Sequence, residues 1–230
     1  CETTSRDTLW TLRPRCDTPR VGVMVRYIDI HPVDPQQRAV DQAVKVLRDG
    51  GLVAYPTDSG YALGAQLGNA EALTRIKQLR QLDDKHHFTL VCKDFSQLGQ
   101  FVHVDNSVFR ALKAATPGPY TFILPGTPEV PKRMLHAKKK TVGVRIPEHR
   151  VVRALLEELG EPILSSTLIL PGETEPMTQA WLIGEEIGDQ LDAIIDSGEE
   201  IVAEPTTVVD LSSGEPVVLR EGAGDTSRFE

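Results

Sequence analysis

The sequence is poor in cysteine and aromatic residues, and it has no long apolar run. The three cysteines, Cys1, Cys16 and Cys92, lack the spacing of a metal site or a redox motif, which favours a reducing compartment and a small, buried Cys92. No segment is apolar over the length of a membrane span, and the N-terminus has no signal-peptide core. We therefore expect a soluble, cytoplasmic protein that has no membrane partner.

Basic residues are also in deficit. The chain has 25 Lys and Arg against 33 Asp and Glu, a net charge of -8, which argues against general nucleic-acid binding but leaves room for a local basic pocket. At 230 residues it is long enough to bury a core without a disulfide or metal, so we expect a single domain.

Several familiar catalytic motifs are missing. The chain has no G-x-x-x-x-G-K-[ST] loop, no G-x-G-x-x-G after a strand and no G-x-S-x-G turn, which argues against a P-loop NTPase, a Rossmann dehydrogenase and a serine hydrolase. His86 and His87 lie beside Asp83 and Asp84, but adjacent histidines in a polar loop rarely bind one ion. We predict no metal site.

Apolar patterning predicts an α/β fold. The apolar residues of 1–23 follow neither the helix period nor the strand period. We interpret this segment as a disordered leader or, as we favour, as sequence upstream of a true start at Met24. Residues 24–230 alternate between predicted strands and helices, which indicates a single-domain, open and twisted mixed sheet flanked by helices. Strands are predicted at 27–30, 52–55, 88–92, 120–124, 141–146, 163–170, 193–195, 206–211 and 216–220. Helices are predicted after Asp34, Asn69, Asp94 and Asp105, at 151–159 and around Trp181.

The segment 55–64 is the centre of this pattern. The strand 52–55 runs into Pro56, so Thr57, Asp58 and Ser59 are expected just past its carboxyl end, where open α/β sheets bind ligands. The alternative is an ordinary strand-turn-strand connection.

Basic and hydroxyl residues recur at the predicted strand ends. They are Thr57, Arg80, Lys85, Thr121, Arg145, Thr167, Thr206 and Arg220. Arg145 and Arg220 lie within or at the end of apolar strands, where a buried guanidinium needs a partner. That partner is either an acidic residue, for which Asp58, Asp210 and Glu221 are available, or an anionic ligand such as a phosphate or carboxylate.

The segment 55–64 resembles the Y-P-T-E-T-x-Y-G-L-G signature of the YrdC family, the threonylcarbamoyl-AMP synthases, and the chain is most similar to the YciO branch. The resemblance continues in order through residues 117–121, 142–147, 205–208 and 219–222, and it covers 28–224. It implies a concave basic face that binds ATP or AMP, with Mg²⁺ as counter-ion, together with threonine and bicarbonate. In the family, the threonylcarbamoyl-adenylate then serves modification of tRNA adenosine 37. By resemblance, Thr57, Thr121, Arg145 and Thr206 hold the threonine end, and Arg80, Lys85, Thr167 and Arg220 face the nucleotide.

The sequence departs from the synthases at two elements. Where the synthases have K-x-R, this chain has Gln78 in place of the lysine, two positions before Arg80. Where they have S-x-N, it has Thr167-Leu168-Ile169, so threonine replaces the serine and isoleucine replaces the asparagine. Loss of two phosphate contacts would slow adenylate formation by about 10² to 10⁴-fold, so we expect ligand binding with weak or altered synthase activity, including a related acyl transfer or hydrolysis. Two alternatives stay open. One is a non-catalytic binder of double-stranded RNA or tRNA that uses the basic segment 132–140, and the other is an interaction protein with a decayed site. Oligomeric state is left open.

Overall fold

The computed structural model describes residues 25–83 and 86–229. The predicted leader 1–23, Met24 and Lys85 lie outside the described residues. The strands are β1 (Arg26–Asp29), β2 (Val53–Thr57), β3 (Gly60–Gln66), β4 (Thr89–Val91), β5 (Tyr120–Pro125), β6 (Thr141–Arg145), β7 (Ile163–Thr167), β8 (Ala193–Asp196), β9 (Thr207–Asp210) and β10 (Val217–Arg220). The helices are α1 (Gln37–Arg48), α2 (Ala70–Arg80), α3 (Phe95–Phe101), α4 (Asn106–Ala115), α5 (Arg150–Leu159) and α6 (Ala180–Ile187), with short 3₁₀ turns at Lys132–Met134 and Gly188–Gln190.

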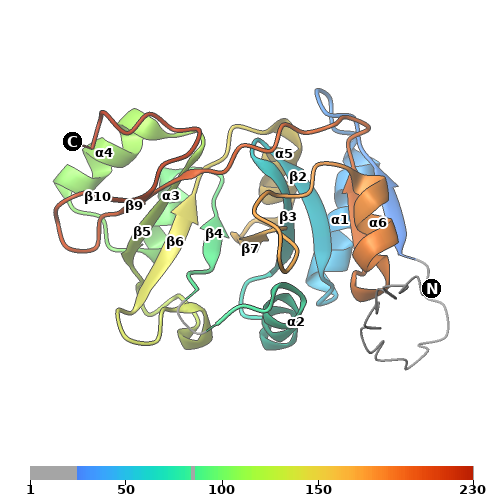
Figure 1. Cartoon of the computed structure of the whole chain (residues 1–230), viewed down its shortest axis with the longest axis horizontal. Helices are drawn as coiled ribbons and strands as arrows, with labels where there is room; N and C mark the ends of the chain where they lie inside the picture. Colours follow the sequence, from blue (N-terminus) through green and yellow to red (C-terminus); the bar gives the residue numbers. More distant parts are fainter. Residues whose placement is uncertain (1–24, 84–85, 230) are drawn as a thin grey trace, which may run out of the picture.

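All ten strands described join one mixed sheet, in the order β1-β8-β2-β3-β7-β4-β6-β5-β9-β10. The pairs β1/β8, β2/β8, β4/β6 and β5/β9 are parallel, and the others are antiparallel. The predicted mixed sheet flanked by helices is therefore confirmed (Figure 1).

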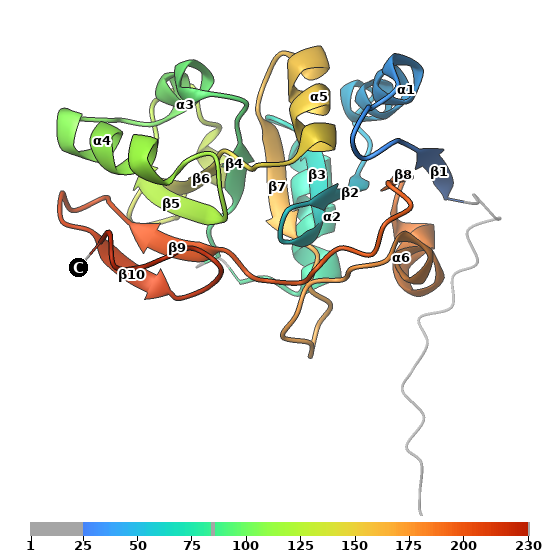
Figure 2. The ribbon, with the colours of Figure 1, turned by 90° about the horizontal axis from the view of Figure 1, so that it is seen from above.

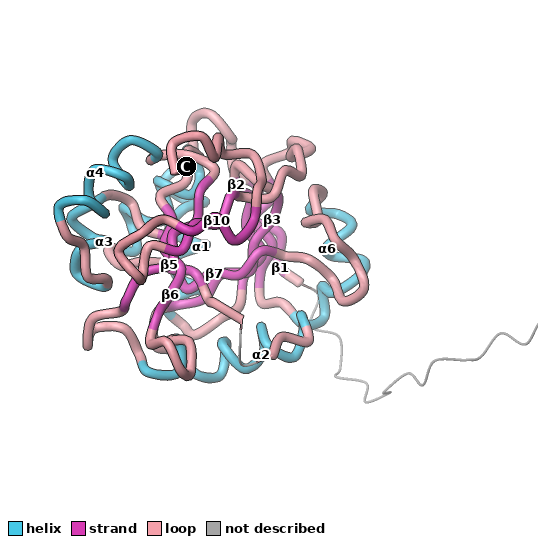
Figure 3. Tube along the Cα trace, turned by 60° about the vertical axis from the view of Figure 1, so that its left-hand side comes forward, coloured by secondary structure: helices cyan, strands magenta, loops and turns pink. Residues whose placement is uncertain are grey.

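The helices cover the sheet from both sides. Figure 2 shows α1, α3, α4 and α5 along one side and α6 on the other, and Figure 3 shows the strands running through the middle. One apolar cluster joins α1 and α5 to β1, β2 and β8, and a larger cluster joins the remaining helices to the sheet. On the α6 side, the segment between β8 and β9 runs across the sheet from near α6 to the β9–β10 pair (Figure 2).

Local signals in the sequence account for the helix starts. Asn69 accepts a hydrogen bond from the Ala72 amide at 3.0 Å, and Asp94 and Asp105 accept bonds from the first turns of α3 and α4, as predicted. The buried face of α4 is formed by Val108, Leu112 and Ala115, whereas Phe109 is 42% exposed.

The segment 55–64 forms a β-hairpin, so the strand-turn-strand alternative describes its backbone. The prediction that Pro56 ends the strand is wrong, since β2 continues to Thr57 and Pro56 lies opposite Tyr61. Proline is tolerated there because β8 pairs only with Val53 and Ala54, which leaves the later part of β2 paired on one side. Similarly, the predicted strand 163–170 stops at Thr167.

Candidate functional site

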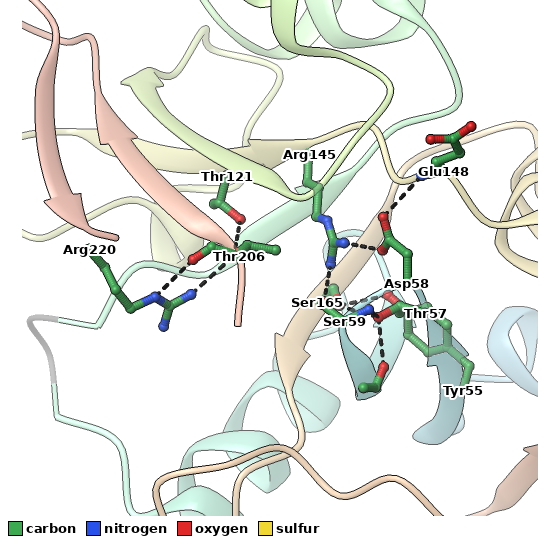
Figure 4. Close-up of polar contacts among 11 residues, drawn as sticks. Tyr55, Thr57, Asp58, Ser59, Thr121, Arg145, Glu148, Ser165, Thr206 and Arg220 are labelled. Atoms are coloured by element: carbon green, nitrogen blue, oxygen red, sulfur yellow. Dashed lines mark hydrogen bonds and ion pairs between the residues drawn. The ribbon is translucent and has the colours of Figure 1, made fainter. Parts of the chain in front are cut away.

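The turn between β2 and β3 meets the last residue of β6. Arg145 is only 7% exposed; its guanidinium pairs with the Asp58 carboxylate and donates to Ser59 Oγ at 2.9 Å (Figure 4). The second Asp58 oxygen accepts the Glu148 amide at 3.2 Å. The prediction that Arg145 needs a partner is confirmed, and of the three acidic candidates Asp58 supplies it. The Nε atom of Arg145 is nevertheless buried without a hydrogen-bond partner.

Local bonds fix the conformation of this turn. Thr57 Oγ1 donates to the Gly60 carbonyl at 2.6 Å and accepts the Ser59 amide at 3.2 Å. Gly60 has a φ of +108°, and a Cβ at that position would lie 2.5 Å from Pro176 Cβ. The hairpin therefore presents Asp58 and Ser59 to Arg145 in one arrangement.

A second cluster comes from β5, β9 and β10. The hydroxyls of Thr121 and Thr206 are 3.1 Å apart, and the Arg220 guanidinium donates to the carbonyl and the hydroxyl of Thr206, each at 3.0 Å. Figure 4 shows this cluster beside the Arg145 cluster. Arg220 is exposed as a whole residue, although its guanidinium is partly buried against Thr206, so the expectation that the residue lies buried is wrong. It is the last residue of an edge strand and follows an irregularity in the pairing of β9 with β10.

A third arginine, Arg80, enters from the last position of α2. It donates to Ser166 Oγ at 2.6 Å and to the Ile169 carbonyl at 3.3 Å. These bonds tie α2 to β7 and to the segment that follows it.

The three clusters line two adjoining cavities. We call them the inner cavity, of about 30 Å³, and the outer cavity, of about 280 Å³. All four residues predicted for the threonine end, Thr57, Thr121, Arg145 and Thr206, line the inner cavity. The described residues predicted to face the nucleotide, Arg80, Thr167 and Arg220, all line the outer cavity, and Lys85 lies outside the described residues.

The two cavities share one wall. Thr89, Thr121, Ser166, Thr167 and Thr206 line both of them. A ligand of sufficient length can therefore contact both cavities at once. Because these residues come from β4, β5, β7 and the start of β9, the strand order itself creates the junction.

The charge of the site is one-sided. Among the described residues, neither cavity lining contains an acidic side chain. Burial, followed by repulsion from Arg220, lowers the pKa of Arg80 to about 10, and partial burial followed by repulsion from Arg145 lowers the pKa of Arg220. Burial and then the charge of Arg80 lower the pKa of His86 to about 4, so His86 is neutral near pH 7. These shifts agree with the placement of Arg80, His86 and Arg220 around one cavity.

Sequence reasoning missed several members of the lining. His86 and His87 were considered only as metal ligands, yet both line the outer cavity, and His87 Nε2 is 2.9 Å from Thr141 Oγ1. Within the described residues, no group of three or more His, Cys, Asp or Glu is placed to hold a metal. Ser165 and Ser166 lie in the predicted strand 163–170 but were not among the predicted site residues; both line the inner cavity, and their hydroxyls within an apolar strand were the available signal.

The comparison with known families decides the relationship. The Sua5/YciO/YrdC family model, described as "Telomere recombination", matches residues 45–222. The chain belongs to this family. It is 49% identical to the uncharacterised protein YciO of Escherichia coli K12 over 206 residues, which is 90% of this chain and all of that protein. An uncharacterised Haemophilus influenzae protein is 48% identical over 209 residues, again 90% of this chain and all of that protein.

Solved structures of Sua5/YciO/YrdC proteins have the same architecture. The crystal structure of E. coli YciO matches with a TM-score of 0.87, over 90% of this chain and 100% of that one, at 49% identity. The structure of P. abyssi Sua5 complexed with L-threonine matches with a TM-score of 0.78 and 28% identity, over 85% of this chain and 57% of that one. No helix in the described part of the chain is long and apolar enough to cross a membrane.

Proposed function

We propose that this protein binds a nucleotide or an adenylate of the threonylcarbamoyl type across the inner and outer cavities. The observation that supports the proposal best is the placement of Arg80 and Arg220 on the outer cavity, whose lining holds no acidic side chain among the described residues. An anion bound there supplies negative charge that these two arginines lack, whereas Arg145 in the inner cavity is already paired with Asp58.

The two cavities suggest how such a ligand divides. Arg220 and Arg80 bind the phosphate, and the hydroxyls of Thr121, Thr167 and Thr206 orient the linkage next to it. The inner cavity has room for little more than a water molecule. A carboxylate at the other end of the ligand therefore reaches Arg145 by taking the place of Asp58, and it gains the unpaired Nε of Arg145 as an additional donor.

The chemistry required of such a site is positioning and charge neutralisation. A carbamate attacking an α-phosphate needs no nucleophile from the protein, and neither cavity lining offers a cysteine or lysine among the described residues. Since the outer cavity lining also lacks a carboxylate, Mg²⁺ would arrive with the nucleotide as its counter-ion.

Synthase activity is proposed to be weak or altered. Gln78 is exposed on α2, and Ile169 places an apolar side chain in the outer cavity where a synthase has an amide. With threonine, bicarbonate and ATP, we expect pyrophosphate release about 10² to 10⁴-fold slower than in a synthase. Release of threonylcarbamoyl groups from modified tRNA is the parallel assay for a hydrolytic relative of the reaction. Pyrophosphate release at the rate of a synthase would contradict the effect assigned to the two substitutions.

Calorimetric titration with AMP, ATP and a non-hydrolysable threonyl-adenylate analogue tests binding. Arg220→Gln removes one of the two arginine charges that line the outer cavity, so we expect the affinity for AMP to fall about 10 to 100-fold. Arg110→Gln, at an exposed position on α4, is the control and should bind as the unmodified protein does. Absence of binding to all three ligands, or equal affinity in both variants, would exclude this site.

A second candidate function is binding of tRNA or double-stranded RNA through the basic segment 132–140. His136 stacks on His87 with ring centroids 4.8 Å apart, and His87 lines the outer cavity, so this segment is continuous with the site. Lys132, Arg133 and Lys138 are exposed, whereas Lys139 pairs with Asp210 at 3.5 Å. Gel shifts with tRNA should lose affinity steeply between about 50 and 200 mM salt if this function holds.

A further inference from the structure

A separate cavity of about 510 Å³ lies where β4 and β6 end, and we call it the rear cavity. Of the residues that line the inner and outer cavities, it shares only Pro147 with the former and none with the latter. Its walls are the start of α3, the first two turns of α5 and the residues between α4 and β5. Nothing in the proposed adenylate site uses it.

The rear cavity has the position of a ligand crevice in an α/β sheet. β4 and β6 are adjacent parallel strands, and residues directly after each of them line the cavity, Cys92 after β4 and Ile146 after β6. Helices begin on both sides of the cavity from these same strand ends. Open α/β sheets bind ligands in crevices outside the carboxyl ends of parallel strands.

The floor of the rear cavity is apolar. It is formed by Cys92, Phe95, Ile146 and Leu156, of which three are buried and Phe95 is half-buried. Burial raises the pKa of the Cys92 thiol to about 12, so it stays protonated and behaves as another apolar group. A floor of this kind fits a flat or branched hydrocarbon body.

The rim of the rear cavity has a small excess of positive charge. Lys93, Arg150 and Arg153 line it together with the acidic Asp94 and Glu148. Asp94 is engaged, because its carboxylate caps α3 by accepting the Gln97 amide at 2.8 Å. Arg153 pairs with Glu157 on the surface, where both side chains are more than half exposed, and such a pair exchanges readily for a ligand anion.

The wall on the α5 side has one buried polar atom without a hydrogen-bond partner. His149 Nδ1 is buried and has no hydrogen-bond partner, although it belongs to a residue that lines the cavity. The same residue stands at the N-cap of α5 and makes no side-chain cap, in contrast to Asp94 at the start of α3. Buried polar atoms without partners are rare in native proteins, and a bound group that supplies the bond is one explanation of this one.

We propose that the rear cavity is a second ligand site, for a small carboxylate with an aromatic or branched apolar body. The body lies on the floor of Cys92, Phe95, Ile146 and Leu156. The carboxylate lies at the rim, between Arg153 and the first turn of α5, where His149 can complete its bonding. This inference does not depend on the adenylate site.

The test is a titration of ¹⁵N-labelled protein with indole-3-acetate, followed by amide chemical shifts. We expect saturable shifts at Val151 and Val152 in α5 and at Cys92, and a dissociation constant below about 10 mM. Indole-3-acetamide has the same body without the charge and should bind at least about tenfold more weakly. Equal affinity of the amide would overturn the carboxylate assignment, and absence of saturable shifts at these residues would overturn the site.

Variants separate the rear cavity from the adenylate site. Arg153→Glu, at an exposed position that should not disturb folding, is expected to weaken indole-3-acetate binding at least about tenfold, whereas the control Arg110→Glu should not. Arg220→Gln should leave the affinity for indole-3-acetate unchanged, although the same substitution lowers the affinity for AMP. Unchanged affinity in Arg153→Glu, or a loss in Arg220→Gln, would contradict the proposal.

Discussion

Replacement of Asp58 by asparagine is the most direct test of the charge arrangement in the site. The substitution keeps the shape of the side chain and removes its charge, so the Arg145 guanidinium loses the carboxylate that neutralises it. Arg145 is 7% exposed and cannot turn to solvent without leaving the inner cavity. Breaking a fully buried pair costs about 3 to 5 kcal/mol, and because the Asp58 side chain keeps 18% exposure we expect about 2 to 3 kcal/mol.

This loss should be visible in thermal unfolding. For a domain of this length, each kcal/mol shifts the melting temperature by about 2 to 4 °C, so Asp58→Asn should melt about 4 to 12 °C lower. Added acetate supplies a small carboxylate that can take the place of the missing Asp58 charge, and it should raise the melting temperature of the variant more than that of the unmodified protein. Circular dichroism at several acetate concentrations measures both effects.

Asp49→Asn is the matched control. Asp49 pairs with Lys45 on the surface of α1, where the two side chains are 62% and 72% exposed, so its loss should cost no more than about 0.5 kcal/mol. If Asp58→Asn has the same melting temperature as the unmodified protein, Asp58 is not the counter-ion of Arg145. If acetate stabilises both proteins equally, the carboxylate does not take the place of Asp58.

Two further predictions concern packing and pH. Gly64→Ala would place a Cβ 2.7 Å from Tyr55 Cε1 in the core and should lower the free energy of unfolding in urea by about 1 to 3 kcal/mol. Gly99→Ala in α3 would place a Cβ with no other atom within 4 Å and should raise the free energy of unfolding by up to about 1 kcal/mol. A change of the same sign in both variants would contradict the close packing at Gly64. The pKa of His86 is about 4 in the folded protein and about 6.5 when unfolded, so the unfolded chain binds more protons between these values. The free energy of unfolding should therefore fall by roughly 2 to 3 kcal/mol as pH drops from 6.5 to 4, and His86→Gln, unlike the exposed His103→Gln, should flatten this dependence.

Local features of the fold could be predicted from sequence because they depend on neighbouring residues. Asn69, Asp94 and Asp105 cap helices through amides two or three positions away, and the apolar spacing of α1 and α5 defines their buried faces. The strand end predicted at Pro56 was wrong, because proline is tolerated within β2 beyond the point where β8 stops pairing, and β8 lies far along the chain.

The site was predictable in its residue types but not in its pairing. Asp58 was one of three acids available to the arginines, and the sequence could not choose among them, because the 87 positions between Asp58 and Arg145 are bridged only by the order of β3, β7, β4 and β6. For the same reason Ser165 and Ser166 in β7 look like a polar interruption of a strand until β3 and β4 place them beside the cavities. The rear cavity has no sequence signature, since it arises where two parallel strands end side by side.

The position of β8 between β1 and β2 governs the order in which the nascent chain can complete its sheet. β1 pairs with β8, which is made about 170 residues later, so at usual rates of synthesis β1 waits roughly 8 to 33 s for its partner. During that time the β2–β3 hairpin is formed while the Val53–Ala54 side of β2 stays open. An open strand edge recruits other chains, so products that end before Ala193 should aggregate on the ribosome or soon after release.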